Sequence, residues 1–181
     1  MKLKVSVIAL MAGLALAAPG MADPVSVDSF ALAPRIKDKV AAGGELNIYV
    51  SYHDTSNEFA PAIKAGVEKG DAIEGVTAHF IGPVGADADA QISEIETLMN
   101  DMDGLAISSV STDALAPIIN RVIEAGIPVI TYNTDNPDSK RLVFAGQDLV
   151  QSGREAGKLM GDVLGGKGRV MIATIDASAQ W

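Results

Sequence analysis

The chain contains no cysteine among its 181 residues. It therefore cannot form a disulfide, attack a substrate with a thiol or hold a metal through thiolates. Histidine is almost as scarce, because His53 and His79 are the only two and lie far apart in the sequence. We predict no metal site, no cofactor and no catalytic residue, and we interpret the chain as a binding protein rather than an enzyme.

Basic residues are also few, with 14 Lys and Arg against 23 Asp and Glu, which gives a net charge of −9. Residues 1–22 contain two lysines and no acid, so removing them as a signal peptide lowers the net charge to −11. A chain this acidic is repelled by nucleic acids and by anionic membrane surfaces. We therefore expect neither of these partners.

The apolar run over residues 5–19 is too short to span a bilayer and follows Lys2 and Lys4. A charged segment, a short apolar segment and small residues at the −3 and −1 positions are typical of a secretory signal peptide. We predict cleavage after Ala22 and a periplasmic protein. The alternative is a membrane anchor, which the length of the run disfavours. Lipid attachment at an N-terminal cysteine is excluded.

What the chain does contain is a regular alternation of strand and helix patterns. Predicted strands cover residues 46–52, 75–81, 104–108, 128–132, 142–146 and 169–175. Predicted helices cover residues 33–42, 88–101 and 148–164. A further helix is capped by Asn57 or Glu58 and carries Phe59, Ile63 and Val67 on one stripe, and another is capped near residues 111–113 and ends at Gly126. This pattern predicts an α/β fold, a doubly wound parallel sheet with helices on both faces.

Polar residues follow almost every predicted strand. They include the clusters at residues 51–54, 108–109, 132–135 and 146–148. In a parallel α/β sheet, ligands bind beyond the carboxyl ends of the strands. The amide, hydroxyl and carboxylate of Asn133, Thr134 and Asp135 offer the donors and acceptors that a polyol needs. The alternative is ordinary turn chemistry, since Asn and Asp both favour turns.

Aromatic side chains accompany these polar clusters. Tyr52, Phe59 and Tyr132 are able to cover the apolar C–H side of a sugar ring. Ser51, His53 and Asp54 do not form a triad by adjacency, because successive strand residues point to opposite faces. His79 lies inside a strand that we expect near the sheet edge, as a partly solvated residue rather than a ligand.

Three motifs carry a resemblance to a known family. They are Ile127–Asp135 (IPVITYNTD), Phe144–Asp148 (FAGQD) and Ser152–Gly157 (SGREAG), and residues 103–109 fit the family's third strand. In this order and spacing they resemble the periplasmic sugar-binding proteins of ABC importers, of the type I or ribose-binding group. The resemblance covers residues 45–181.

The resemblance implies two lobes joined by hinge strands that close on a ligand. Asn57 and Phe59 match the family's sugar-contacting asparagine and aromatic residue, after a longer loop. Asn133 and Thr134 stand where ribose binders have an aspartate and an arginine, so ribose bound in the same manner is not expected. Asp148 matches a polar hinge residue, and Trp181 falls in a loop of the second lobe that faces the cleft.

We therefore predict a signal peptide (1–22), an N-terminal leader segment (23–44), a first lobe (45–146) and the start of a truncated second lobe (147–181). The expected ligand-binding residues are Tyr52, His53, Asp54, Asn57, Phe59, Tyr132, Asn133, Asp135, Asp148 and Trp181. The predicted function is a monomeric substrate-binding component that passes a monosaccharide or related polyol to an ABC transporter permease in the inner membrane. The alternatives are a periplasmic sensor that presents its ligand to a chemoreceptor or kinase, and an exported α/β hydrolase.

Overall fold

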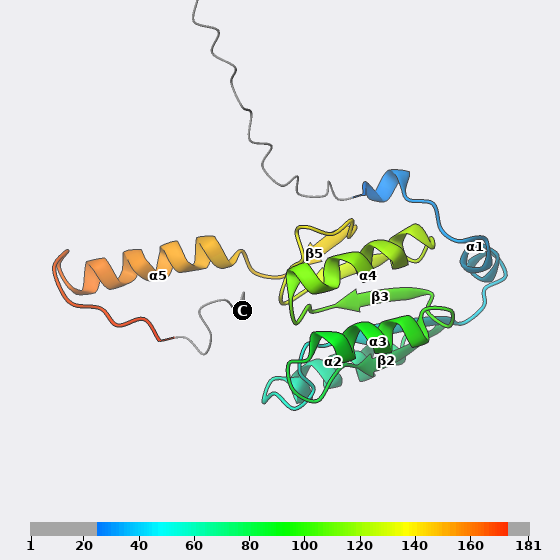
Figure 1. Ribbon diagram of the computed structural model, residues 1–181, viewed down its shortest axis with the longest axis horizontal. Coiled ribbons are helices and arrows are strands. Elements are labelled where there is room, and N and C mark those ends of the chain that lie inside the picture. The colour runs from blue at the N-terminus through cyan, green and yellow to red at the C-terminus, as the bar shows by residue number, and fades with distance from the viewer. Residues whose placement is uncertain (1–24, 174–181) are drawn as a thin grey trace, which may run out of the picture.

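The computed structural model describes residues 25–173. The predicted signal peptide, its cleavage site and Trp181 lie outside these residues. The described part contains a five-stranded, fully parallel sheet in the order β2-β1-β3-β4-β5 (Figure 1). The strands are β1 (Leu46–Ser51), β2 (Val76–Ile81), β3 (Gly104–Ile107), β4 (Val129–Tyr132) and β5 (Val143–Ala145). The parallel α/β class predicted from the alternation is confirmed.

Helices cover both faces of the sheet, as expected for a doubly wound fold. The helices of the described residues are α1 (Pro34–Ala41), α2 (Ala60–Asp71), α3 (Ala88–Leu98), α4 (Thr112–Glu124) and α5 (Leu149–Val163), preceded by a short 3-10 turn, η1 (Val27–Ser29). Of these, α2 covers one face of the sheet, and α3 and α4 cover the other. None of the helices within residues 25–173 combines the length and the apolar character that a membrane-spanning helix needs.

The core lies between the sheet and the pair α3 and α4. Alternate strand residues such as Tyr49, Leu105 and Val129 point into it, because side chains along a strand alternate between faces. The inward residues predicted for the helix before Gly126 are all buried: Leu115, Ile118, Ile119, Val122 and Ile123. On the other face, Ile48, Val50, Ala106 and Ile130 line an apolar groove of about 560 Å³ beside α2.

Side-chain caps set the starts of three helices. Ser111 accepts a hydrogen bond from the Ala114 N–H, Asp87 from Ala90 and Asp148 from Gln151. Each cap pairs a backbone donor that the first helical turn leaves without a partner. The caps near residues 111–113 and at Asp148 were predicted from the sequence and are confirmed.

The start of α2 differs from the prediction. The capping position is Phe59, without a side-chain cap, rather than Asn57 or Glu58. Asn57 instead accepts a hydrogen bond from the Phe59 N–H at 2.8 Å, which closes a turn just before the helix. Phe59 therefore precedes the helix and is 67% exposed, so its predicted place on one helical stripe with Ile63 and Val67 was wrong.

The strand predicted over residues 169–175 is also absent from residues 169–173, the part of it that the structure describes. Residues 167–173 have no regular structure, and Met171 and Ile172 are each 88% exposed. A strand needs a neighbour to pair its backbone groups, and no strand within the described residues lies beside this segment. Helix α5 has no buried residue and extends away from the sheet (Figure 1).

Residues 25–44, interpreted from the sequence as part of a leader, are packed on the lobe. Ile36 of α1 is 2% exposed and belongs to the core. The Ala33 N–H donates to the Gly126 carbonyl at 2.8 Å, at the end of α4. Helix α1 therefore packs on the same core as the elements that follow residue 45.

Candidate ligand-binding site

The carboxyl ends of β1, β3 and β4 lie side by side, because these strands are neighbours in the sheet. Their order brings together polar side chains that are up to 82 residues apart in the chain, from Ser51 to Asn133. This is the edge at which parallel α/β sheets bind ligands. The structure therefore assembles three of the four polar clusters found in the sequence.

The Ser108 hydroxyl lies at the centre of this assembly and is fully buried. Its Oγ is 2.9 Å from His53 Nδ1 and accepts a hydrogen bond from Asn133 Nδ2 at 3.2 Å. His53 is itself 4% exposed. Burial lowers the pKa of His53 below its ordinary value, and the negative charge of Asp54 only partly offsets this. The ring is therefore neutral at neutral pH.

Gln91 of α3 supports the site from beneath and was not among the predicted residues. Its Nε2 donates to Ser51 Oγ at 2.9 Å and to the Ser108 carbonyl at 3.0 Å, and its Oε1 accepts from the Val110 N–H. Gln91 is fully buried, four residues before the buried Ile95 on the same helix. A polar side chain on the apolar stripe of α3 was the signal in the sequence.

Asn133 follows β4 in a left-handed backbone conformation, with φ of 57°. Asn tolerates this region better than most residues with a side chain, and such conformations are enriched at functional sites. Its Nδ2 is held by Ser108 and lies 3.4 Å from Thr134 Oγ1. Among the described residues no donor pairs with Asn133 Oδ1, which leaves an acceptor at the exposed edge of the cluster.

Tyr52 and Tyr132 provide the aromatic part of the site. Their ring centroids lie 6.4 Å apart with 22° between the planes, and the Tyr52 ring also lies 4.2 Å from the ring of His53. The Tyr132 hydroxyl donates to the Ser51 carbonyl at 3.2 Å. Burial raises the pKa of Tyr132, so its hydroxyl stays neutral. Tyr52 is 3% exposed, so of the pair only Tyr132 is partly exposed.

The carboxylate of Asp54 is used within its own loop. Its Oδ1 accepts from the Ser56 hydroxyl at 2.5 Å, from the Ser56 N–H at 2.9 Å and from the Gly85 N–H at 2.9 Å. These bonds, the Ser56 hydroxyl first, hold the pKa of Asp54 below its ordinary value.

Asp135 is likewise paired within the protein. Its Oδ2 accepts from Arg141 Nη2 at 2.6 Å, and its Oδ1 accepts from Arg141 Nε, from Thr131 Oγ1 at 2.6 Å and from the Asn136 N–H at 2.7 Å. Burial alone would raise the pKa of Asp135, but the bonds from Arg141 and Thr131 outweigh it and lower the pKa. Asp135 thus closes the loop between β4 and β5.

The remaining predicted residues lie further out. Asn57 and Phe59 stand at the exposed start of α2, and Asp148 caps α5. Asp148 also lines a cavity of about 410 Å³ with Phe144 and Gln147, where the chain leaves β5. Trp181 lies outside the described residues.

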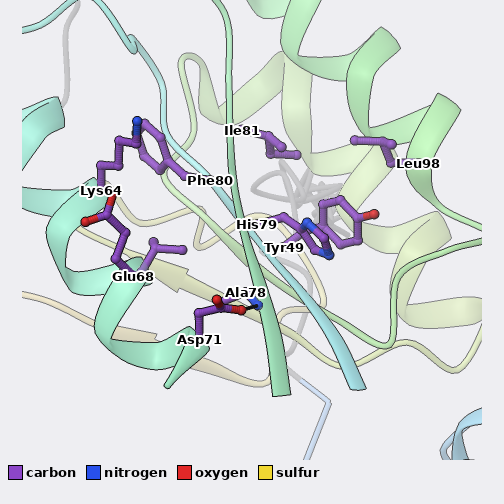
Figure 2. Close-up of a pocket in the computed structure, with 10 residues that line it drawn as sticks. Tyr49, Lys64, Glu68, Asp71, Ala78, His79, Phe80, Ile81 and Leu98 are labelled. Carbon is purple, nitrogen blue, oxygen red and sulfur yellow. Dashed lines mark hydrogen bonds between the residues drawn. The ribbon is translucent and has the colours of Figure 1, made fainter. Parts of the chain in front are cut away.

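A second cavity, of about 480 Å³, lies along the outer edge of β2 (Figure 2). There the rings of Tyr49 and His79 stack with centroids 4.4 Å apart, and Asp71 accepts a hydrogen bond from the Ala78 N–H. His79 is thus the partly buried edge residue that the sequence predicted. Lys64 and Glu68 lie on the other side of the strand and also line the cavity. We assign no site to it.

Within residues 25–173 no group of three or more His, Asp or Glu side chains is placed to hold a metal ion. The site consists instead of neutral hydroxyl, amide, imidazole and phenol groups. Such groups recognise an uncharged polar ligand by hydrogen bonding.

Comparison with known proteins agrees with this geometry. The sequence model of a family described as "Periplasmic binding protein domain" matches residues 48–180. The chain belongs to this family. Its sheet and helices form a lobe of the type I periplasmic binding fold, which confirms the resemblance and the fold class predicted from the sequence. The family is one of substrate-binding proteins.

Individual relatives share part of their length with the chain. A xylitol-binding protein of Mycolicibacterium smegmatis is 32% identical over 89 residues, which are 48% of this chain and 25% of the relative. An ABC transporter solute binding protein from Burkholderia graminis, solved in complex with D-arabinose, is 26% identical with a TM-score of 0.65, over 70% of this chain and 44% of that one. XylFII, solved in a complex with LytSN, is 28% identical with a TM-score of 0.61, over 66% of this chain and 44% of that one. The chain thus spans less than half the length of these solved structures and about a quarter of the curated relative.

Proposed function

We propose that this chain carries the first lobe of a substrate-binding component of an ABC importer, and that it binds a monosaccharide or related polyol. The observation that carries the proposal is the neutral cluster of Ser108, His53, Asn133 and Tyr132 at the carboxyl edge of the sheet. The two nearby carboxylates accept hydrogen bonds within the protein, Asp54 from Ser56 and Gly85 and Asp135 from Arg141. A half-site whose carboxylates are already hydrogen-bonded in this way suits an uncharged, hydroxylated ligand.

The relatives support this choice of ligand. One is a xylitol-binding protein and another was solved with D-arabinose bound. Both ligands are small, uncharged and rich in hydroxyl groups. In this proposal Asn133 and Tyr132 contact the ligand, while Asp135 holds the loop that carries Asn133.

The second half of the site belongs to another lobe. We propose that residues 147–181 begin this lobe, since the chain covers under half of the solved relatives. The 410 Å³ cavity at Phe144 and Asp148 lies where the chain leaves the first lobe, which fits a hinge. Closure of the two lobes would exclude water from the ligand. The exported protein would act as a periplasmic monomer and deliver its ligand to a permease in the inner membrane.

Calorimetry on two proteins tests the proposal. The 181-residue chain should bind xylitol and D-arabinose weakly, because half of the cleft is absent. A longer protein that carries a complete second lobe should bind at least one neutral sugar or polyol tightly. Equal affinities for the two proteins would show that the site does not lie between lobes.

Asn133→Ala in the longer protein tests the position of the site. Loss of one hydrogen bond in a desolvated cleft should cost about 1–3 kcal/mol, or roughly 5- to 150-fold in affinity. His79→Ala is the control, because His79 lies on the edge strand β2 away from the site. Normal binding by Asn133→Ala together with lost binding by His79→Ala would move the site to the β2 edge.

The second candidate function is a periplasmic sensor that presents its ligand to a chemoreceptor or kinase. The observation in its favour is that XylFII was solved in a complex with LytSN. A periplasmic binding lobe that presents its ligand to a second protein would use the same carboxyl edge. Co-purification from the native host distinguishes the two, since an importer component associates with a permease and a sensor component with a receptor or kinase.

A further inference from the structure

The hydrogen-bonding direction at Ser108 follows from its neighbours. Asn133 Nδ2 is a donor, so Ser108 Oγ accepts that bond. The serine is fully buried, and a buried hydroxyl proton needs an acceptor. Among the described residues, the acceptor within reach of this hydroxyl is Nδ1 of His53, at 2.9 Å.

These steps order the three residues into a chain of donors and acceptors, which we call the relay. Asn133 donates to Ser108, and Ser108 donates to His53 Nδ1. A neutral imidazole that accepts at Nδ1 carries its proton on Nε2. The amide that donates through Nδ2 keeps its carbonyl Oδ1 as an acceptor, and no donor among the described residues pairs with it.

We propose that Ser108 is a positioning residue, whose hydroxyl fixes His53 in the Nε2–H tautomer and holds Asn133 with Oδ1 as the acceptor offered to the ligand. This inference rests on the proposed function for its ligand part only. It also assigns the direction of the hydrogen bond to the ligand, because Asn133 Oδ1 accepts from a ligand hydroxyl and does not donate to it. A ligand lacking a hydroxyl at that position leaves the acceptor unpaired.

The support beneath Ser108 fits this role. Gln91 fixes the Ser108 carbonyl at 3.0 Å, so the backbone of the serine is held independently of its hydroxyl. The left-handed conformation of Asn133 places its side chain back over β3, at 3.2 Å from the Ser108 hydroxyl. Two separate restraints thus converge on one hydrogen bond.

The tautomer is measured without any ligand. In the 181-residue chain labelled with ¹⁵N-histidine, long-range proton–nitrogen correlations distinguish Nδ1–H from Nε2–H rings. A measurement at pH 8, about 1.5 units above the ordinary histidine pKa, keeps the ring neutral. His79→Gln removes the second histidine and assigns the signals. His53 should show the Nε2–H pattern.

Two variants change the relay and one leaves it intact. Ser108→Ala removes the donor to Nδ1, so the Nε2–H preference should weaken. Asn133→Asp replaces a donor by an acceptor, so the serine proton should turn to the carboxylate and His53 should move to Nδ1–H. Ser109→Ala is the matched control, because this neighbouring buried serine accepts from Asn136 instead and should leave the tautomer unchanged.

An Nδ1–H ring in the wild type, or an unchanged tautomer in both relay variants, overturns the proposal. If Ser108→Ala fails to fold, Asn133→Asp decides alone, since Asn133 is exposed.

In the longer protein, Ser108→Ala should weaken binding of xylitol or D-arabinose roughly tenfold, or about 1.4 kcal/mol. If the wild type binds neither sugar while the tautomer shifts as stated, the proposed function fails and the relay stands. If the wild type binds and Ser108→Ala binds equally well, the positioning role is excluded.

Discussion

Asp103 is 2% exposed, yet it carries a charge at the amino end of β3. Arg35 Nη1 donates to its Oδ1 at 2.7 Å, while Lys39 Nζ and the Asn47 N–H donate to its Oδ2 at 2.5 and 2.9 Å. Burial raises the pKa of Asp103, but the bonds from Lys39 and Asn47 and the two positive charges outweigh it, so the net pKa is lowered. One carboxylate thereby ties α1 to two strands of the sheet.

We expect Asp103→Asn to lower the free energy of unfolding by about 2–3 kcal/mol. Breaking a fully buried pair costs roughly 3–5 kcal/mol, and the cost is smaller here because the Arg35 and Lys39 side chains are 42% and 33% exposed. Urea unfolding at pH 7 measures the loss. Asp101→Asn, two residues away and exposed, is the control and should change little.

The same carboxylate predicts an acid dependence. A folded-state pKa below the unfolded value of about 3.9 gives a stabilisation that is complete only well above the unfolded pKa and is lost as pH falls toward and through the folded pKa. The difference in stability between wild type and Asp103→Asn should therefore shrink between pH 4 and pH 2.5. A constant difference over this range would contradict the assigned ion pairs.

Asp135 and Arg141 form a second ion pair. Unlike the ion pairs of Asp103, it fixes the loop that carries Asn133. Asp135→Asn should destabilise the lobe by roughly 1.5–3 kcal/mol, the usual cost of hydrogen bonds to a charged group. Chemical denaturation measures it. Asp138→Asn, an exposed residue of the same loop, serves as the control. Unchanged stability together with lost sugar binding would return Asp135 to the role of a direct ligand contact.

At the scale of elements, the contact between α1 and the end of α4 depends on a glycine. Gly126 has φ of 77°, and a Cβ placed on it would lie 2.5 Å from the Ala33 nitrogen. The Ala33 N–H also donates to the Gly126 carbonyl. A residue with a side chain at 126 would have to displace α1 and with it the buried Ile36.

Comparison of two glycine variants isolates this effect. Gly75 has a similar φ of 80° but open space around its Cβ position. Gly75→Ala should therefore cost about 1–2 kcal/mol for the left-handed backbone alone, and Gly126→Ala should cost clearly more. Hydrogen exchange should show lost protection in α1 for Gly126→Ala only. Equal losses for both variants would mean that α1 adapts to the added methyl group.

At the scale of the whole molecule, the charged start, the short apolar run and the small residues before Asp23 predict export. Mass spectrometry of the protein isolated from its host should find Asp23 as the first residue, after cleavage behind Ala22. A mature protein that retains Met1 would contradict the prediction and favour the membrane anchor.

The sequence by itself determined the class of the fold and most of its elements. Apolar strands alternating with amphipathic helices admit few arrangements other than a parallel sheet, and local signals such as Ser111, Gly126 and Asp148 mark helix ends through backbone hydrogen bonds. These predictions succeeded because each depends on residues within one turn. The start of α2 was misplaced because Asn57 competes for the backbone of Phe59.

Only the tertiary structure decided which polar residues form the candidate site. Asp135 and Asn133 are two residues apart, but one pairs with Arg141 and the other with Ser108, a strand away. Gln91, which was not among the predicted site residues, supports the site from α3. α1 joined the lobe through Asp103, 68 residues from Arg35. Such pairings depend on strand order and side-chain direction, which no local pattern encodes, and therefore the site's chemistry emerged only from the fold.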